Sequence, residues 1–168
     1  GLLSAVGFRF TIRKGMRLSI LRSLLNDVFA RKKDESRQVR SGLPSVIATV
    51  QEDPHAVPSR RVLNVGGNSK AIPLPPEYEG FDHWLLDIDP KGSPDIVCDA
   101  RELTTLEPEM FDAVYCSHNL EHYYRHDVPR VLAGFQHVLK DGGFAHIRVP
   151  DINEVMRVTI ERGLDIDD

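Results

Sequence analysis

From residue 61 onward the chain contains five short hydrophobic runs, each separated from the next by polar or turn-forming residues. Near-continuous apolar runs of this length are typical of strands that are buried on both faces of a parallel sheet. The first run ends abruptly at Gly66 and Gly67, which predicts a sharp turn at the carboxyl end of a strand. The strands are predicted within residues 62–65, 83–88, 96–98, 111–116 and 144–149.

Three further segments have apolar side chains every three or four residues, which is the spacing of an amphipathic helix. The most regular of them begins after Asp127, which has the position of an N-cap, and has Pro129 in its first turn. We expect this helix to end at residues 141–143, Asp-Gly-Gly, which lead into the fifth strand. The other two helices are predicted over 16–30 and 153–162.

The alternation of strands with helical or turn segments predicts an α/β fold, with a mostly parallel, doubly wound sheet and helices on both faces. Residues 71–80 contain three prolines, so any helix after the first strand must be short. Right-handed crossovers bring the carboxyl ends of parallel strands to one edge, which is where open α/β sheets hold their ligands. That edge is predicted to collect Gly66, Asp87, Asp99, Ser117 and Pro150.

Charge is distributed unevenly along the chain. The net charge of the 168 residues is −4, but residues 1–40 carry ten Lys and Arg against three Asp and Glu, which leaves −11 for the remainder. This predicts a basic helical leader and linker, 1–57, followed by an acidic core domain, 58–168, and an acidic core argues against a nucleic-acid partner. The basic side of residues 16–33 either stays solvated while the helix packs on its own domain, or contacts an anionic membrane surface or a partner protein.

Cysteine content and hydrophobicity favour a cytoplasmic protein. Cys98 and Cys116 each lie inside a predicted strand, where we expect reduced thiols rather than zinc ligands or a disulfide. No apolar run reaches the roughly 18 residues that a membrane span requires. The opening residues GLLSAVGF are too short for a signal peptide and lack its flanking features. Because the chain also lacks an initiator methionine, we expect an internal fragment or a processed form.

Two aspartates at the predicted carboxyl edge fit a nucleoside ligand. Asp87 follows Gly66 by 21 positions and stands at the tip of the neighbouring strand. A carboxylate there can accept hydrogen bonds from both hydroxyls of a ribose, and Asp99, at the tip of the next strand, can accept one from an adenine amino group. Each aspartate has the alternative of capping a helix or facing water.

Five segments, in their order and spacing, resemble the successive motifs of the class I S-adenosylmethionine-dependent methyltransferases, in particular the small-molecule type with a Leu-Glu-His segment after the fourth strand. They are RVLNVGG, LLDIDP, IVCDARELTTL, FDAVYCSHNLEHY and VLKDGGFAHIRVPD, which extend from residue 61 to about residue 151. The resemblance implies a Rossmann-like fold, S-adenosylmethionine as cofactor, and methyl transfer to an acceptor, most simply a small molecule. It also implies a sheet that is C-terminally truncated, because the family has two further strands after the helix at 153–162. We therefore expect a fragment, or a reduced form that a partner completes.

The resemblance assigns cofactor-binding roles to residues at four strand tips. In chain order these are Gly66, Gly67 and Asn68 in a turn around the methionine part, Asp87 at the ribose, Ile88 beside the adenine, Asp99 and Ala100 as the adenine-binding pair, and Ser117 and His118 in the loop that lines the cofactor.

The resemblance also places Asn64 among the cofactor-binding residues, but two positions depart from the family pattern: Asn64 stands where an acidic residue is usual, and Asn68 where a further glycine is usual. Asparagine keeps a carbonyl acceptor and tolerates left-handed backbone, so the turn can still form. The charge that would face the cofactor's cationic groups is missing, which leaves a non-catalytic cofactor-binding or regulatory subunit as an alternative. A third possibility is a dinucleotide or nucleotide-sugar enzyme, although GxGxxG would require glycine at Asn68 and Ala71.

A hydroxyl or protonated amine acceptor needs a general base in addition to the cofactor. His118 and His122 are the catalytic candidates, because imidazole titrates near neutral pH and both residues follow the fourth strand at the reactive edge. A structural role, hydrogen-bonding to backbone, is the alternative for His122. Together with His126 they are spaced by four, as metal ligands on a helix would be, but the resemblance assigns this loop to the cofactor and we expect no metal.

Overall fold

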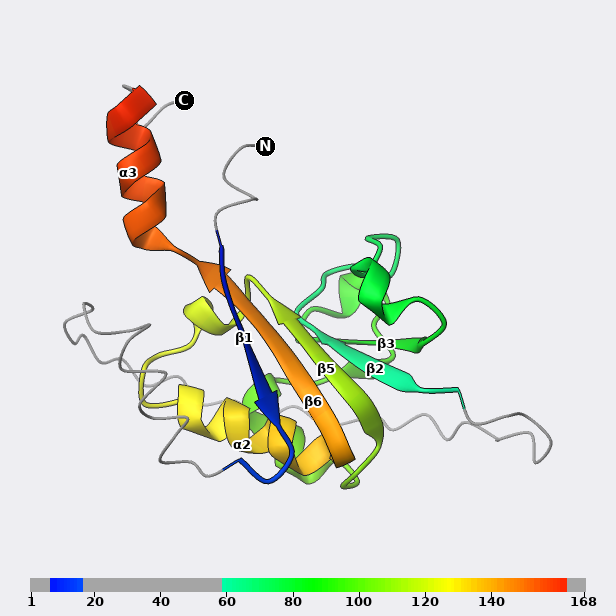
Figure 1. Ribbon diagram of the computed structural model, residues 1–168. Helices are drawn as coiled ribbons and strands as arrows, with labels where there is room; N and C mark the ends of the chain where they lie inside the picture. The colour runs from blue at the N-terminus through cyan, green and yellow to red at the C-terminus, as the bar shows by residue number, and fades with distance from the viewer. Residues whose placement is uncertain (1–6, 17–58, 163–168) are drawn as a thin grey trace.

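Six strands form one mixed sheet in the part of the chain that the computed structural model describes, residues 7–16 and 59–162 (Figure 1). The strands are β1 (Gly7–Arg13), β2 (Arg61–Val65), β3 (Asp82–Asp87), β4 (Ile96–Val97), β5 (Phe111–Ser117) and β6 (Leu139–Pro150). Across the sheet they lie in the order β1-β6-β5-β2-β3-β4. All neighbours are parallel except β1, which runs antiparallel to β6. The α/β fold and the mostly parallel sheet are therefore confirmed.

In the same part of the chain, two α-helices and four short 3-10 segments lie between or after these strands. The α-helices are α2 (Val128–Val138) and α3 (Ile152–Arg162), and the 3-10 turns are η2 (Pro76–Tyr78), η3 (Pro90–Gly92), η4 (Ala100–Thr105) and η5 (Leu120–His122). The predicted strands and the two predicted helices in this region are confirmed, with bounds that differ by a few residues. The helix predicted over 16–30 lies outside the described residues, apart from its first residue.

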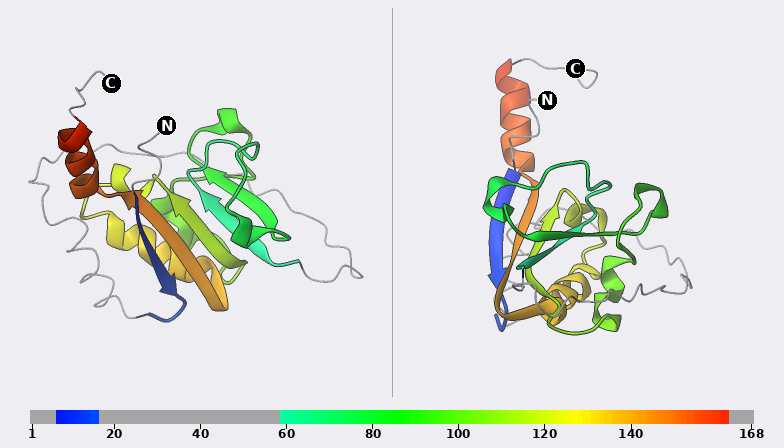
Figure 2. Two further views of the ribbon diagram at one scale, coloured as in Figure 1. Left: turned by 45° about the horizontal axis from the view of Figure 1, so that its top comes forward. Right: turned by 90° about the vertical axis from the view of Figure 1, so that its right-hand side faces the viewer.

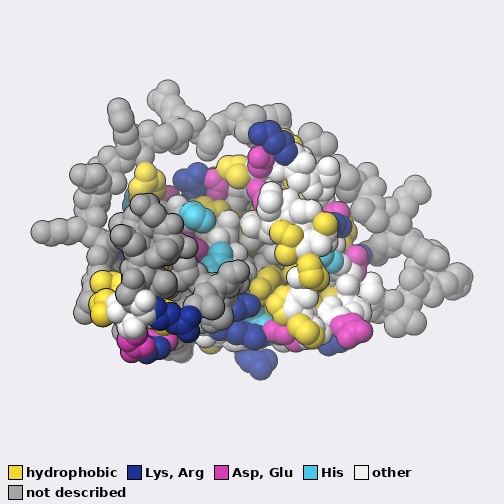
Figure 3. Space-filling view, turned by 90° about the horizontal axis from the view of Figure 1, so that it is seen from above, with side chains coloured by type: hydrophobic (Ala, Val, Ile, Leu, Met, Phe, Trp, Pro, Cys, Tyr) yellow, Lys and Arg dark blue, Asp and Glu magenta, His cyan; other side chains and the backbone are white. Residues whose placement is uncertain are grey.

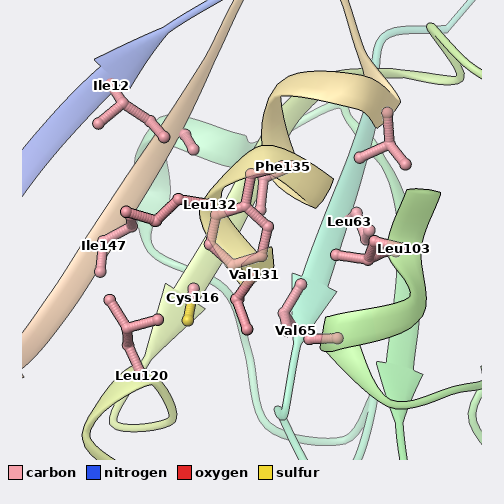
Figure 4. Packing of buried hydrophobic residues seen from close by; sticks show 14 of the residues in the cluster. Ile12, Leu63, Val65, Leu103, Cys116, Leu120, Val131, Leu132, Phe135 and Ile147 are labelled. Carbon is pink, nitrogen blue, oxygen red and sulfur yellow. The ribbon is translucent and has the colours of Figure 1, made fainter. Parts of the chain in front are cut away.

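The main hydrophobic core lies between one face of the sheet and the pair α2 and η4 (Figure 4). Leu132 and Phe135 of α2 are fully buried there, and burial of side chains of this size contributes roughly 1.5–3 kcal/mol each. The helix approaches η4 closely, because a Cβ added to Gly134 would lie 2.6 Å from the Cβ of Leu103. Figure 2 shows α2 against one side of the sheet and α3 projecting beyond the end of β6.

The opposite face has a smaller buried cluster, made by Val62, Tyr78 and Ala113 with partly buried neighbours. Among the described residues, no α-helix covers this face, so the prediction of helices on both faces is not met there. The prolines of residues 71–80 explain the difference, because only the short turn η2 forms between β2 and β3. That turn supplies Tyr78, whose hydroxyl lies 2.8 Å from Nδ1 of His146 on β6.

Strand β1 was not predicted, although it pairs with β6 along its whole length, from Gly7 opposite Pro150 to Arg13 opposite Phe144. Its buried residues Phe10 and Ile12 alternate with exposed ones, and both join the main core. The alternation of apolar and polar residues in GFRFTIR is the period-2 signal of a half-buried strand, which could have identified it.

The predicted end of the central helix was wrong by several residues. α2 ends at Val138, and residues 141–143 lie within β6 rather than at the helix terminus. Asp127 does precede the helix, but its side chain makes no capping hydrogen bond. Its carboxylate instead accepts a hydrogen bond from Nη1 of Arg101 at 3.3 Å.

Among the described helices, none is long and apolar enough to cross a membrane.

Candidate functional site

A sharp turn follows β2 at the carboxyl edge of the sheet. Gly66 has φ of +71°, a conformation that glycine adopts without strain, and its N–H donates to the carbonyl of Leu86 on the neighbouring strand at 2.8 Å. Asn68 also has a positive φ, of 60°, which asparagine tolerates better than most residues. A Cβ on Gly66 would lie 2.1 Å from Nδ2 of Asn119, so the turn packs directly against the loop after β5.

Asp87 lies beside this turn, as the sequence predicted. Its Oδ2 accepts a hydrogen bond from the N–H of Asn68 at 3.1 Å, and its Oδ1 accepts one from the N–H of Asp89 at 3.0 Å. Each carboxylate oxygen has a further lone pair, so the group can still accept bonds from a ligand. Ile88, the next residue, is 61% exposed and offers an apolar surface next to the carboxylate.

The Asp99 carboxylate accepts more hydrogen bonds from the protein than the Asp87 carboxylate does. It caps η4 by accepting from the N–H of Arg101 at 2.9 Å, and it also accepts from Nε and Nη2 of that arginine at 3.0 and 2.6 Å. Burial would raise the pKa of Asp99, but these hydrogen bonds outweigh it and hold the pKa below its usual value. The structure therefore shows Asp99 in the alternative role that the sequence allowed, as the N-cap of η4. The neighbouring Ala100 is buried.

Tyr123 brings the loop after β5 next to Asp99 and Ala100. Its ring packs against the main core, and burial together with the nearby Asp99 charge raises its pKa to about 12. The sequence leaves Tyr123 with two alternatives of equal weight, packing against the domain or stacking on an aromatic acceptor, and the structure shows that it packs against the core.

The loop after β5 is held to the end of β6. His118 has φ of 52°, and its N–H donates to the carbonyl of Arg148 at 3.0 Å. Its side chain is 41% exposed, with Nδ1 3.7 Å from Oε1 of Glu121, an ion-pair distance when the imidazole is protonated. Ser117, which ends β5, is opposite Arg148 in the sheet. The loop therefore places an imidazole and a carboxylate side by side at the edge.

Two buried side-chain oxygens of this loop have no hydrogen-bond partner among the described residues: Oδ1 of Asn119 and Oε2 of Glu121. Leaving a buried acceptor without a donor costs about 1–3 kcal/mol. Both residues were missed as site candidates by the sequence analysis, although Glu121 is part of the Leu-Glu-His segment. Unused acceptors of this kind fit a ligand that carries N–H or O–H donors.

Asn64 points away from solvent beneath the glycine turn. It is 5% exposed, and its Nδ2 lies 3.3 Å from Nε2 of His83. A Cβ on Gly67 would lie 2.1 Å from Nδ2 of Asn64, so the amide fills the space under that glycine. Burial lowers the pKa of His83, which favours the neutral imidazole next to this amide. No carboxylate is present at this position to face a cation.

The other histidines of the loop are exposed. His122 lies in η5, and within the described residues its side chain has no hydrogen bond or ion pair. His126 stacks on the ring of Tyr124, with ring centroids 5.5 Å apart. Within residues 7–16 and 59–162, no three His, Cys, Asp or Glu side chains are grouped so that they could hold a metal ion.

Viewed from above the carboxyl edge, histidine and acidic side chains lie near the middle of the face, beside a group of hydrophobic ones (Figure 3). The structure thus brings together the glycine turn, Asp87 and the loop after β5. Asp99 and Ala100 lie next to the loop after β5 through Tyr123.

Comparison with known protein families finds a match to part of the chain. The family model described as a methyltransferase domain matches residues 80–147, which include β3, β4, β5, α2 and most of β6. The resemblance to the class I S-adenosylmethionine-dependent methyltransferases is therefore confirmed. Among curated proteins, no match to the chain was found.

Proposed function

We propose that this chain, whose residues 80–147 match a methyltransferase domain, binds S-adenosylmethionine at the carboxyl edge of its sheet and transfers the methyl group to a small-molecule acceptor. The observation that carries the proposal is the Asp87 carboxylate at the tip of β3, hydrogen-bonded to the N–H of Asn68 in the glycine turn. A carboxylate fixed in this way beside a sharp turn is suited to accept both hydroxyls of a ribose.

Other residues of the edge fit the same cofactor. The exposed side chain of Ile88 offers an apolar surface for the adenine ring. The two oxygens of Asn119 and Glu121 that have no donor within residues 7–16 and 59–162 offer acceptors for a group with N–H donors. Asp99 has its two oxygens bonded to Arg101, so its contribution to adenine binding is limited to the remaining lone pairs, and the exposed edge of β4 at Val97 gives further apolar surface.

When bound, the cofactor's sulfonium supplies both the methyl group and the leaving group, so little covalent chemistry falls to the protein. The chain's own task is to hold an acceptor about 3–3.5 Å from the methyl carbon in line with the breaking bond. His118 is the better placed of the two candidate bases, because Glu121 lies 3.7 Å from its Nδ1 and can stabilise the imidazolium. His122 has no such partner among the described residues.

The first experiment measures the affinity for S-adenosylhomocysteine by calorimetry. Asp87→Ala is expected to weaken binding at least tenfold, since two charge-assisted hydrogen bonds to the ribose are lost. The matched control is Asp82→Ala, which removes an exposed carboxylate from the opposite end of the same strand and should leave the affinity unchanged. Equal affinities of Asp87→Ala and the unchanged protein would contradict the ribose assignment.

A non-catalytic cofactor-binding subunit is the second candidate, and the absence of a carboxylate at Asn64 favours it. Methyl transfer from isotope-labelled S-adenosylmethionine to components of a cell extract separates the two candidates. Transfer that is lost in His118→Ala, while S-adenosylhomocysteine still binds, supports the enzyme. Binding without transfer to any component supports the subunit. A larger thermal shift with NAD than with S-adenosylhomocysteine would instead indicate a dinucleotide protein.

A further inference from the structure

The glycine turn lacks negative charge at the position directly beneath it. The buried Asn64 side chain is neutral, is occupied with His83, and fills the space under Gly67. A ligand with a cationic group at this turn therefore gains no ion pair from β2. Burying such a cation without an opposite charge is costly, so a carboxylate from another element is needed.

Glu121 is a carboxylate suitably placed for this purpose. It lies in η5, two residues after Asn119, and the Asn119 side chain packs against Gly66. Burial, and after it the nearby Glu121 charge, raises the pKa of the Cys116 thiol, which is opposite Val65, the last residue of β2. The carboxylate thus belongs to the same short stretch of the edge as the glycine turn.

Glu121 also has unused bonding capacity. Its Oε1 lies 3.7 Å from His118, whereas its Oε2 is buried with no donor within the described part of the chain, as is Oδ1 of Asn119. The terminal carboxylate rotates readily about its last bond, so either oxygen can meet a donor at the edge. Two acceptors, one of them charged, suit an ammonium group better than a neutral donor.

We propose that Glu121, assisted by Oδ1 of Asn119, binds the ammonium group of the methionine part of the cofactor, and so supplies from the loop after β5 the charge that β2 lacks at Asn64. This inference rests on the proposed function. It gives a chain with a neutral residue beneath the glycine turn a negative charge with which to hold a cofactor that has an amino-acid tail.

The test compares three probes in Glu121→Gln, a substitution of nearly equal size. S-adenosylmethionine has both the sulfonium and the ammonium, S-adenosylhomocysteine has the ammonium alone, and 5′-methylthioadenosine has neither. Loss of one charge-assisted interaction is expected to weaken binding of the first two roughly 10- to 100-fold, and to leave 5′-methylthioadenosine unchanged. Glu107→Gln, which neutralises an exposed carboxylate before β5, is the control and should change none of the three affinities.

Each other outcome overturns the inference. Weaker binding of S-adenosylmethionine alone would place Glu121 at the sulfonium, and equal weakening of all three probes would indicate a structural role. No change in any affinity would remove Glu121 from the site. Failure of the unchanged protein to bind any of the probes would refute the proposed function itself, and the inference with it.

A second variant keeps the test independent of how well Glu121→Gln folds. Asn119→Asp adds a carboxylate of the same shape beside the proposed ammonium. It is expected to raise the affinity for S-adenosylhomocysteine severalfold relative to that for 5′-methylthioadenosine. An unchanged ratio of the two affinities would contradict the placement of the ammonium between the two side chains.

Discussion

Replacing Gly66 with alanine introduces a Cβ where the structure has the side chain of Asn119. Two separate costs follow. The positive φ of 71° is unfavourable for alanine by about 1–2 kcal/mol. The new Cβ would lie 2.1 Å from Nδ2 and 2.5 Å from Cγ of Asn119, so that side chain must move, at a further cost of about 1–2 kcal/mol. We therefore expect the free energy of unfolding to fall by roughly 2–4 kcal/mol.

Gly80→Ala separates the two costs. Gly80 has a similar φ, of +79°, but no heavy atom lies within 4 Å of an added Cβ, so only the backbone cost of about 1–2 kcal/mol applies. Urea unfolding followed by circular dichroism measures each free energy, and the difference between the two variants reports the contact with Asn119. For a chain of this size, that difference corresponds to roughly 2–8 °C in Tm.

Asn119→Ala completes a double-mutant cycle. In its background, Gly66→Ala should cost no more than Gly80→Ala, because the obstructing side chain is gone. If Gly66→Ala is no more destabilising than Gly80→Ala in the original sequence, or if Asn119→Ala brings no relief, then the glycine turn and the loop after β5 do not pack as described.

Two further predictions concern ionisable groups, one beside the site and one on the opposite face of the sheet. Arg101→Met is expected to lower the free energy of unfolding by about 2 kcal/mol, because it removes the cation that pairs with the Asp99 carboxylate, whose side chain is only 13% exposed. Arg130→Met removes an exposed ion pair to Glu102 and should lower it by less than about 1 kcal/mol in the same assay. Equal losses in the two variants would contradict this reasoning. Burial holds the pKa of His146 below its ordinary value near 6.5, so below that pH the unfolded chain binds a proton that the folded chain does not. The free energy of unfolding should therefore decrease as the pH is lowered from 7 to 5, and this decrease should be smaller in His146→Gln. If His146→Gln has the same pH dependence as the original sequence, His146 is not a buried neutral imidazole.

Much of the site could be predicted from local sequence. Gly66 and Asp87 are marked by their positions at the ends of apolar runs, and parallel pairing of β2 with β3 places those ends side by side, with Val65 opposite Leu86. This follows from the connection rule for parallel strands, which needs no knowledge of side-chain packing. The fold class was predictable for the same reason, because the order of strands and helices along the chain restricts the topology.

The hydrogen-bond partners of each carboxylate could not be predicted in this way. Asp87 and Asp99 stand at equivalent strand tips in the sequence, yet Asp99 is bonded on both oxygens by Arg101, and Asp87 by two backbone N–H groups. The difference depends on the conformation of η4, which turns the Arg101 side chain back onto the strand tip. The sequence likewise gives no sign that one oxygen each of Asn119 and Glu121 is buried without a donor in the described part of the chain.

The sequence by itself determined five of the six described strands, the main helix and the edge of the sheet that brings Gly66 and Asp87 together, since hydrophobic periodicity and glycine positions are local properties of the chain. The tertiary structure decided three things: that β1 joins the sheet next to β6, that η2 takes the place of a helix after β2, and that Asn119 fills the space beside Gly66. Each of these depends on contacts between segments distant in sequence. Such contacts are selected by the packing of the whole domain, which no local pattern encodes.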